Sequence, residues 1–177
     1  FGDGETNSSI IPSQVVASGV IRVAGGSGTS FLIDENNSLF ATGSNTYGQL
    51  GLGDTVNKLL FTKMNTVPVK NVYPNTYQTL FLGTDGSMWG MGRNHRYQLG
   101  DGTNTQRVSP TQIFSNSVAE VGAGYWHTLI RKTDGSLWSN GYGADEQLGD
   151  GSSTSRSSPV QIESGNVTQV SSRGDHG

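Results

Sequence analysis

The stretch Thr133-Asp134-Gly135-Ser136-Leu137-Trp138-Ser139-Asn140-Gly141 predicts a hairpin turn that runs into a β-strand. Asp-Gly favours a type I′ turn, because both central residues of that turn need a positive φ angle and these two residue types tolerate it. Residues 127–132 before the turn and 136–138 after it carry strand-forming side chains. The stretch therefore predicts two short antiparallel strands.

The same pattern recurs along the chain at a spacing of 49 residues, at Thr84-Asp85-Gly86-Ser87-Met88-Trp89 and at Glu35-Asn36-Asn37-Ser38-Leu39-Phe40. A second motif keeps the same spacing, at Phe1-Gly2-Asp3-Gly4, Leu50-Gly51-Leu52-Gly53, Leu99-Gly100-Asp101-Gly102 and Leu148-Gly149-Asp150-Gly151. Matches at one fixed period indicate a repeat architecture. We interpret residues 1–177 as a single repeat domain with copies at 1–49, 50–98 and 99–147, a partial copy at 148–177, and a place in a larger ring or assembly.

The third copy shows four strand candidates, at residues 110–113, 118–121, 127–132 and 136–141. Short strands between Gly-rich turns, with no helical periodicity, predict an all-β protein. Four strands per unit and a period near 50 are typical of a β-propeller with one unit per blade. We therefore expect a partial ring of about three and a half four-stranded antiparallel blades. Phe40, Trp89 and Trp138 share one repeat position, and we expect them to form a structural core between adjacent blades.

Composition limits the function classes. The 177 residues carry a net charge of −3, so no basic surface for nucleic acid is expected. The chain has no cysteine, and no apolar run approaches membrane-spanning length. Charged residues make up only 14%. This low charge, the absent cysteine and three Asn-X-Ser/Thr sequons, at Asn7, Asn36 and Asn166, suggest an extracellular or cell-surface protein.

The composite motif resembles the repeat of the regulator of chromosome condensation family. The residues that carry the resemblance are Val121-Gly122-Ala123-Gly124-Tyr125-Trp126-His127-Thr128, Asp134-Gly135-Ser136-Leu137-Trp138, Gln147-Leu148-Gly149-Asp150-Gly151 and Pro159-Val160. The family usually closes a ring of seven such repeats. Its eukaryotic founder is an exchange factor for the GTPase Ran and binds nucleosomes, and bacterial relatives include secreted proteins that cap β-lactamases with one propeller face.

Two departures separate this chain from the family pattern. A seven-bladed ring would need about twice this length, so we expect a fragment of a ring, a chain that pairs with another copy, or an open arc. The second copy is degenerate, because Leu52 stands where the other copies have Asp and residues 72–78 replace the Gly-rich segment. No segment matches the GTPase-contacting insertion of the exchange factor.

The sequence offers little catalytic chemistry. The resemblance implies a structural hydrogen bond inside the blade for His127 and His176, which share one repeat position. The repeated Asp3, Asp101 and Asp150 could suggest calcium, but one carboxylate per loop favours a turn cap instead. The Gly-rich residues 25–30 lack the Lys-Ser/Thr ending of a phosphate-binding loop. Arg173-Gly174-Asp175 is a weak integrin-type match. We predict neither an enzyme nor a bound cofactor or metal.

Two stretches are the candidate partner-binding residues. The first is the basic loop with Arg93, His95, Arg96 and Tyr97, which is either a solvated loop or a contact patch. The second is Tyr125-Trp126, where aromatic side chains occupy a connection between strands and either bind a partner or pack on the neighbouring blade.

Three functions follow as hypotheses. The leading one is a non-catalytic scaffold for protein–protein interaction. The second is a structural subunit that self-associates into a homo-oligomer, as a completed ring or a filament, because an incomplete ring exposes unpaired strand edges. The third is a guanine nucleotide exchange regulator, by family analogy alone.

Overall fold

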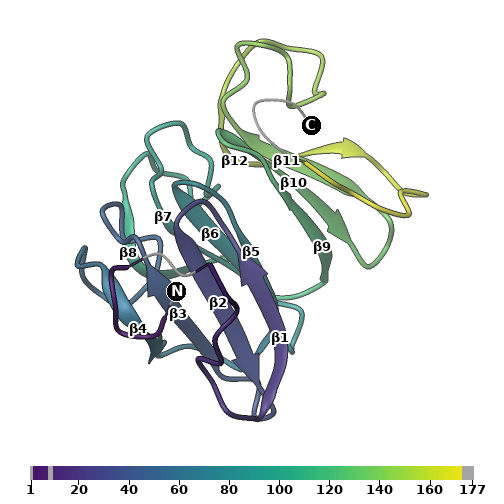
Figure 1. The fold of residues 1–177 in the computed structure, drawn as a ribbon. Coiled ribbons are helices and arrows are strands. Elements are labelled where there is room, and N and C mark those ends of the chain that lie inside the picture. Colours follow the sequence, from purple (N-terminus) through teal and green to yellow (C-terminus); the bar gives the residue numbers. More distant parts are fainter. Residues whose placement is uncertain (1, 8–9, 173–177) are drawn as a thin grey trace.

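The structure is a computed structural model that describes residues 2–7 and 10–172. Its twelve strands form three four-stranded antiparallel sheets, which follow one another in chain order (Figure 1). The first sheet contains β1 (Val20–Gly25), β2 (Thr29–Asp34), β3 (Leu39–Gly43) and β4 (Lys58–Lys63). The second contains β5 (Val69–Pro74), β6 (Gln78–Gly83), β7 (Met88–Gly92) and β8 (Arg107–Phe114). The third contains β9 (Val118–Ala123), β10 (His127–Lys132), β11 (Leu137–Gly141) and β12 (Arg156–Glu163).

This arrangement confirms the predicted all-β class with four-stranded antiparallel blades in a ring that is not closed. The first strands β1, β5 and β9 contact one another from sheet to sheet and form the inner side of the arc. The boundaries of the blades do not coincide with the boundaries of the sequence copies. The strand that contains residues 110–113 is β8, and it pairs with β7 of the preceding copy. A blade therefore takes its outer strand from the next copy.

The predicted type I′ hairpin turn is wrong. In the β10–β11 turn only Gly135 has a positive φ, of 80°, and its N–H donates to the carbonyl of Lys132 at 3.1 Å. Thr133 and Asp134 instead form an ordinary turn that ends in a left-handed residue, the common three-residue hairpin loop. The first copy places Asn37 at the same position with φ 58°, because asparagine tolerates this conformation better than other non-glycine residues.

Two apolar clusters hold the blades together. One joins the first and second sheets around Phe31, Ile33 and Phe81, and the other joins the second and third around Leu80, Leu82 and Ile130. The strand β6 is buried along its whole length because neighbouring blades cover both of its faces. Full burial of each large apolar side chain in these clusters contributes roughly 1.5–3 kcal/mol to the stability of the fold.

The expected core aromatics lie at the joints to the preceding blade. Trp89 packs half-buried against the first cluster, and its ring stacks on Phe81 with the centroids 6.2 Å apart. Trp138 packs against the second cluster beside Phe114. Phe40 is half-buried and lines an apolar groove on the outer face of the first sheet, where no further blade precedes it among the described residues.

The hydrogen bond of His127 differs from the expected one inside the blade. His127 is fully buried, and its Nε2 lies 2.9 Å from Oγ of Ser172, which belongs to the next repeat. At the equivalent position in the second sheet, Gln78 Nε2 donates to the carbonyl of Gly124 at 3.0 Å. This repeat position therefore links consecutive repeats. His176 and the Arg173-Gly174-Asp175 tripeptide lie outside the described residues.

Candidate protein-interaction site

In the first two blades, a buried asparagine closes the loop between the third and fourth strands. In the second sheet, Asn94 Nδ2 donates to Asp101 Oδ1 at 2.9 Å and to the carbonyl of Thr103 at 2.8 Å, while Leu99 N donates to Asn94 Oδ1 at 3.0 Å. Asp101 also accepts from the guanidinium of Arg107 at 2.6 Å. These bonds fix the whole loop from its centre, because Asn94 uses both its donor and its acceptor atoms.

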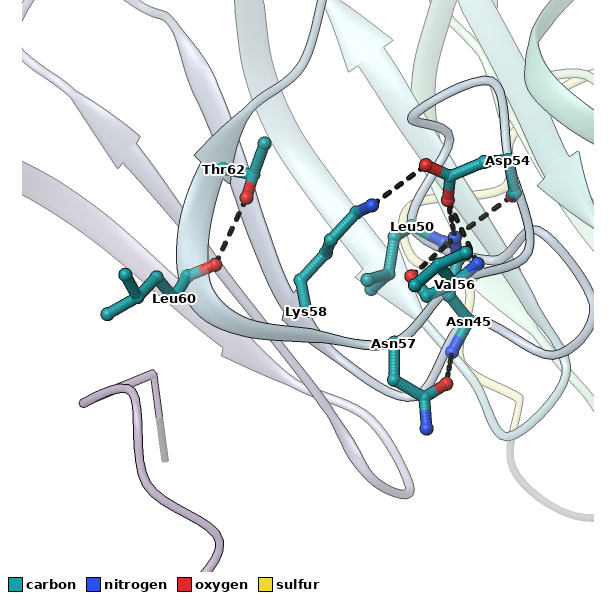
Figure 2. A network of polar contacts seen from close by, with 8 residues as sticks. All are labelled: Asn45, Leu50, Asp54, Val56, Asn57, Lys58, Leu60 and Thr62. Carbon is teal, nitrogen blue, oxygen red and sulfur yellow. Dashed lines mark hydrogen bonds and ion pairs between the residues drawn. The ribbon is translucent and has the colours of Figure 1, made fainter.

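Figure 2 shows the equivalent loop of the first sheet, centred on Asn45. Leu52 stands at the repeat position of Asp101, and the carboxylate comes instead from Asp54, two residues further on. Asn45 Nδ2 donates to Asp54 Oδ1 at 2.9 Å, and Lys58 Nζ lies 2.8 Å from Asp54 Oδ2 (Figure 2). The degenerate second copy therefore still has a carboxylate bound to the loop asparagine, although the carboxylate comes from a different position in the loop. In the third loop, glycine replaces the asparagine at position 143.

The repeated Asp residues act as turn caps, as expected. The backbone N–H two residues on donates to Oδ1 of Asp3, Asp101 and Asp150 at 3.0, 3.0 and 3.1 Å. Burial alone would raise the pKa of Asp101, but its hydrogen bonds from Arg107, Thr103 and Asn94 outweigh that effect and lower the pKa. Among residues 2–7 and 10–172, no cluster of three His, Asp or Glu side chains could hold a metal ion.

The β7–β8 loop, which begins at Arg93, is anchored on the third sheet. Thr128 Oγ1 donates to the carbonyl of Gln98 at 2.8 Å, and Asn140 Nδ2 donates to the carbonyls of Tyr97 and Gln98 at 2.9 and 3.1 Å. Because hydrogen bonds from both blades hold the loop, its side chains have fixed positions.

This loop places Arg93 at the centre of an aromatic cluster, which we define as Arg93, Tyr47, Tyr77, Trp126 and His95. The Cζ atom of Arg93 lies 5.0 Å from the ring centroid of Tyr47, 5.1 Å from that of Tyr77 and 5.2 Å from that of Trp126. The Tyr77 and Trp126 rings stack at 5.6 Å, and His95 meets Trp126 edge-on at 5.2 Å. Each contact falls within the range of favourable cation–π and aromatic pairs.

The members of the aromatic cluster come from all three blades. Tyr47 lies in the β3–β4 loop, Tyr77 in the β5–β6 turn and Trp126 in the β9–β10 turn. Arg93 N donates to the carbonyl of Tyr77 at 2.9 Å, which fixes the two residues relative to each other. The aromatic cluster therefore spans both blade joints on one edge of the arc.

The sequence prediction found part of this site. Arg93, His95 and Trp126 meet in the aromatic cluster, whereas Arg96 lies beside it with its Cζ 4.7 Å from the ring of Tyr142. Tyr125 is 39% exposed and faces a different hollow, at the inner strand ends. Tyr97 has φ 61° and lines the space between the loops at 102–104 and 154–157, away from the aromatic cluster.

The sequence prediction missed Tyr47, Tyr77 and Tyr142. A signal for two of them was present in the repeat register. Tyr47 and Arg96 occupy one repeat position, and Arg93 and Tyr142 occupy another. The pair Tyr47–Arg93 at the first joint and the pair Arg96–Tyr142 at the second joint are therefore the same contact with cation and ring exchanged.

The aromatic cluster carries a positive charge. Partial burial first, and the charges of Arg93 and Arg96 second, lower the pKa of His95 below its ordinary value, so its imidazole is neutral at pH 7. The four ion pairs found among the described residues involve Lys58, Arg107, Arg131 and Arg156, and neither Arg93 nor Arg96.

A propeller arc whose loops form a rigid face defines the chain as a β-propeller repeat protein. Comparison with family models matches the regulator of chromosome condensation (RCC1) repeat over residues 36–77, 85–130 and 134–177, and a second model of the same repeat over residues 20–49. The chain belongs to the RCC1 repeat family. A search of curated proteins found no match.

Solved structures share the fold. Prp20p from Saccharomyces cerevisiae, which binds Gsp1p and histones, matches with a TM-score of 0.80 and 20% identity over 90% of this chain and 43% of that one. Yeast RCC1 (Prp20) bound to Kap60 matches with a TM-score of 0.74 and 21% identity over 84% of this chain and 38% of that one. Human WBSCR16 matches with a TM-score of 0.74 and 22% identity, over 90% and 45%. The chain thus spans less than half the length of these proteins.

Proposed function

We propose that the chain is a non-catalytic propeller scaffold that binds a protein partner through the face of the aromatic cluster. The observation that carries this proposal is the convergence of Tyr47, Tyr77 and Trp126 from three blades on one arginine. Aromatic and Arg side chains dominate the energetic centres of protein interfaces, and rigid rings lose little entropy on binding. Family membership supports the proposal, since Prp20p binds Gsp1p and histones and yeast RCC1 (Prp20) binds Kap60.

The test uses a phage-displayed library of random peptides selected on the immobilised full chain. Affinities of the selected peptides are then measured for the wild type, for Trp126→Ala and for a control, Val56→Ser, which changes an exposed apolar residue in the β3–β4 loop. We expect Trp126→Ala to weaken binding about tenfold or more, since hot-spot residues contribute at least about 2 kcal/mol. Equal affinity for wild type and Trp126→Ala would contradict the proposal.

The second candidate function is self-association through the outer face of the first sheet. Val20 and Val23 of β1 are 36% and 77% exposed, whereas their repeat equivalents Val69 and Val72 are 0% and 5% exposed. Leu60 of β4, at the opposite edge of the sheet, is also exposed and lines the same groove as Val20. The face that is buried at the joints between blades is exposed in the first sheet. Such exposed faces favour pairing with another blade.

Light scattering during size exclusion, over a concentration series, tests self-association. A dimer or larger species that Val23→Lys returns to monomer would support this candidate. A monomer at all concentrations would remove it. The chain forms three complete four-stranded blades, so a two-copy ring would contain six complete blades from the described residues rather than seven.

The exchange-regulator hypothesis rests on family membership alone, because a likeness at 20–22% identity shows the fold only. Release of labelled nucleotide from a small GTPase would test it.

Extracellular or cell-surface placement stays a prediction. The asparagine side chains at positions 7, 36 and 166 are all exposed. Among the described residues, no helix is long and apolar enough to cross a membrane.

A further inference from the structure

The guanidinium of Arg93 is held by its neighbours without being neutralised. Three rings lie within 5.0–5.2 Å of its Cζ atom, so the aromatic cluster encloses the flat cation. In most proteins a partly buried arginine is paired with a carboxylate or bonded to carbonyl oxygens, because its donors otherwise go unused. Here no described residue accepts a hydrogen bond from the Arg93 side chain or forms an ion pair with it.

The nitrogen atoms of Arg93 remain accessible. None of them belongs to the buried polar atoms that lack a partner, and Arg93 as a whole is half-buried. Other arginines of the same chain behave differently. Arg107 and Arg156 sit one repeat apart and each binds the Asp of its own loop, at 2.6 and 2.7 Å. Arg93 is thus a fixed cation whose N–H edge has no acceptor within the described chain.

A guanidinium held among aromatic rings, with N–H groups that have no acceptor, is suited to binding a carboxylate. Contacts with three rings restrict the rotation of the Arg93 side chain, so little side-chain entropy is lost when two parallel N–H···O bonds form. The surrounding aromatic surface partly excludes water, which strengthens a charge-assisted hydrogen bond. Arg96, held over Tyr142 and also without an ion pair, adds a second positive charge beside the site.

We propose that Arg93 binds an Asp or Glu carboxylate at the centre of the partner interface, so that the partner is a protein segment with an acidic side chain flanked by apolar residues. The inference rests on the proposed function, and it adds the chemistry of the partner. The apolar flanks follow from the stacked rings of Tyr77 and Trp126, which offer a half-buried aromatic surface beside the cation.

The experiment uses peptides selected from the random library on the full chain, each made with its acidic residue and with the Gln or Asn replacement. Affinities are measured for the wild type and for Arg93→Lys, which keeps the charge but loses the planar fork. Arg22→Lys, an exposed arginine of β1 on another part of the arc, is the matched control. Thermal unfolding of each variant separates a loss of binding from a loss of fold.

We expect the selected peptides to be enriched in Asp or Glu. Arg93→Lys and the Glu→Gln peptide should each weaken binding about tenfold, and together they should weaken it little further, because both remove the same bidentate contact. Arg22→Lys should leave the affinity unchanged.

Each of the following outcomes would overturn the inference. Peptides that lack acidic residues, or that bind Arg93→Lys as well as wild type while losing affinity for Trp126→Ala, would refute the carboxylate site and leave the proposed function standing. Peptides that bind all variants equally, or no enrichment at all, would count against both. Arg93-dependent binding of a short DNA duplex as tight as that of the peptides would show that phosphate, and not a protein carboxylate, is the ligand.

Discussion

Arg93 and Trp126 belong to different blades, yet the guanidinium carbon of Arg93 lies 5.2 Å from the centroid of the Trp126 ring. The contact crosses the joint between the second and third sheets, and neither residue belongs to the two buried apolar clusters. It therefore joins the blades through side chains that are only half-buried and remain available to a partner.

The first prediction concerns the coupling of these two residues. Arg93→Ala and Trp126→Ala should each lower the free energy of unfolding, and the double variant should lower it by less than the sum. The coupling should be about 0.5–1 kcal/mol, because the pair is partly exposed. Urea unfolding of the four proteins measures it. Strict additivity would show that the contact contributes nothing.

The second prediction concerns the asparagine that closes the β7–β8 loop. Asn94→Ala removes bonds to Asp101, Thr103 and Leu99 and leaves buried groups without partners. We expect the unfolding free energy to fall by about 1–3 kcal/mol. Asn104→Ala, an exposed change in the same loop, is the control and should stay within about 0.5 kcal/mol of the wild type. Similar losses in both variants would contradict the role given to Asn94.

The third prediction concerns close packing under His127. A side chain at Gly124 would clash with the His127 ring, whereas nothing lies within 4 Å of the Cβ position at Gly25. Neither residue has a positive φ, so Gly124→Ala and Gly25→Ala differ only in the space available. Gly124→Ala should destabilise the chain by about 1–3 kcal/mol, as overpacking does, and Gly25→Ala should not. Thermal unfolding compares the two.

The fourth prediction is a dependence of stability on pH. The pKa of Asp101 in the folded state lies below its ordinary value of 3.8. Its ionised form therefore stabilises the fold above pH 3.8, and that contribution is lost as pH falls through the lowered pKa. Asp101→Asn should be clearly less stable than wild type at pH 6, and the gap should narrow as pH falls below 4. A gap that is constant with pH would refute this, and Asp145→Asn, an exposed change, is the control.

The fifth prediction concerns the charge near His95. Burial, Arg93 and Arg96 lower the pKa of His95, in that order of effect. Arg96→Ala removes one of the two repelling charges and leaves His95 against Trp126. The pKa of His95, followed by the NMR shifts of its ring protons, should rise toward the ordinary value. An unchanged pKa would mean that Arg96 does not act on His95.

Periodicity made the blades predictable, because the same strand pattern recurs every 49 residues and each joint buries equivalent positions such as Val69 and Val118. The pairing of strands across copies was not predictable in the same way. The sequence does not show that the strand around residues 110–113 pairs with the preceding copy, since a copy boundary can be drawn at any point of a repeat.

The aromatic cluster was only half predicted for a related physical reason. Apart from Tyr77 and Trp126, its members occupy different repeat positions, so no single alignment column contains them all. Tyr77 takes the position of Trp126, and Tyr47 that of Arg96. The contact between blades is set by the three-dimensional joint, which brings the β3–β4 loop of one blade to the β7–β8 loop of the next.

The most direct test of where a partner binds is hydrogen–deuterium exchange of the full chain, with and without a saturating selected peptide. We expect slower exchange in residues 93–97 and 125–128, with β1 and β4 unchanged. Protection confined to β1 and β4 would place binding on the open outer face of the first sheet and would contradict the assignment of the aromatic cluster as the interaction site.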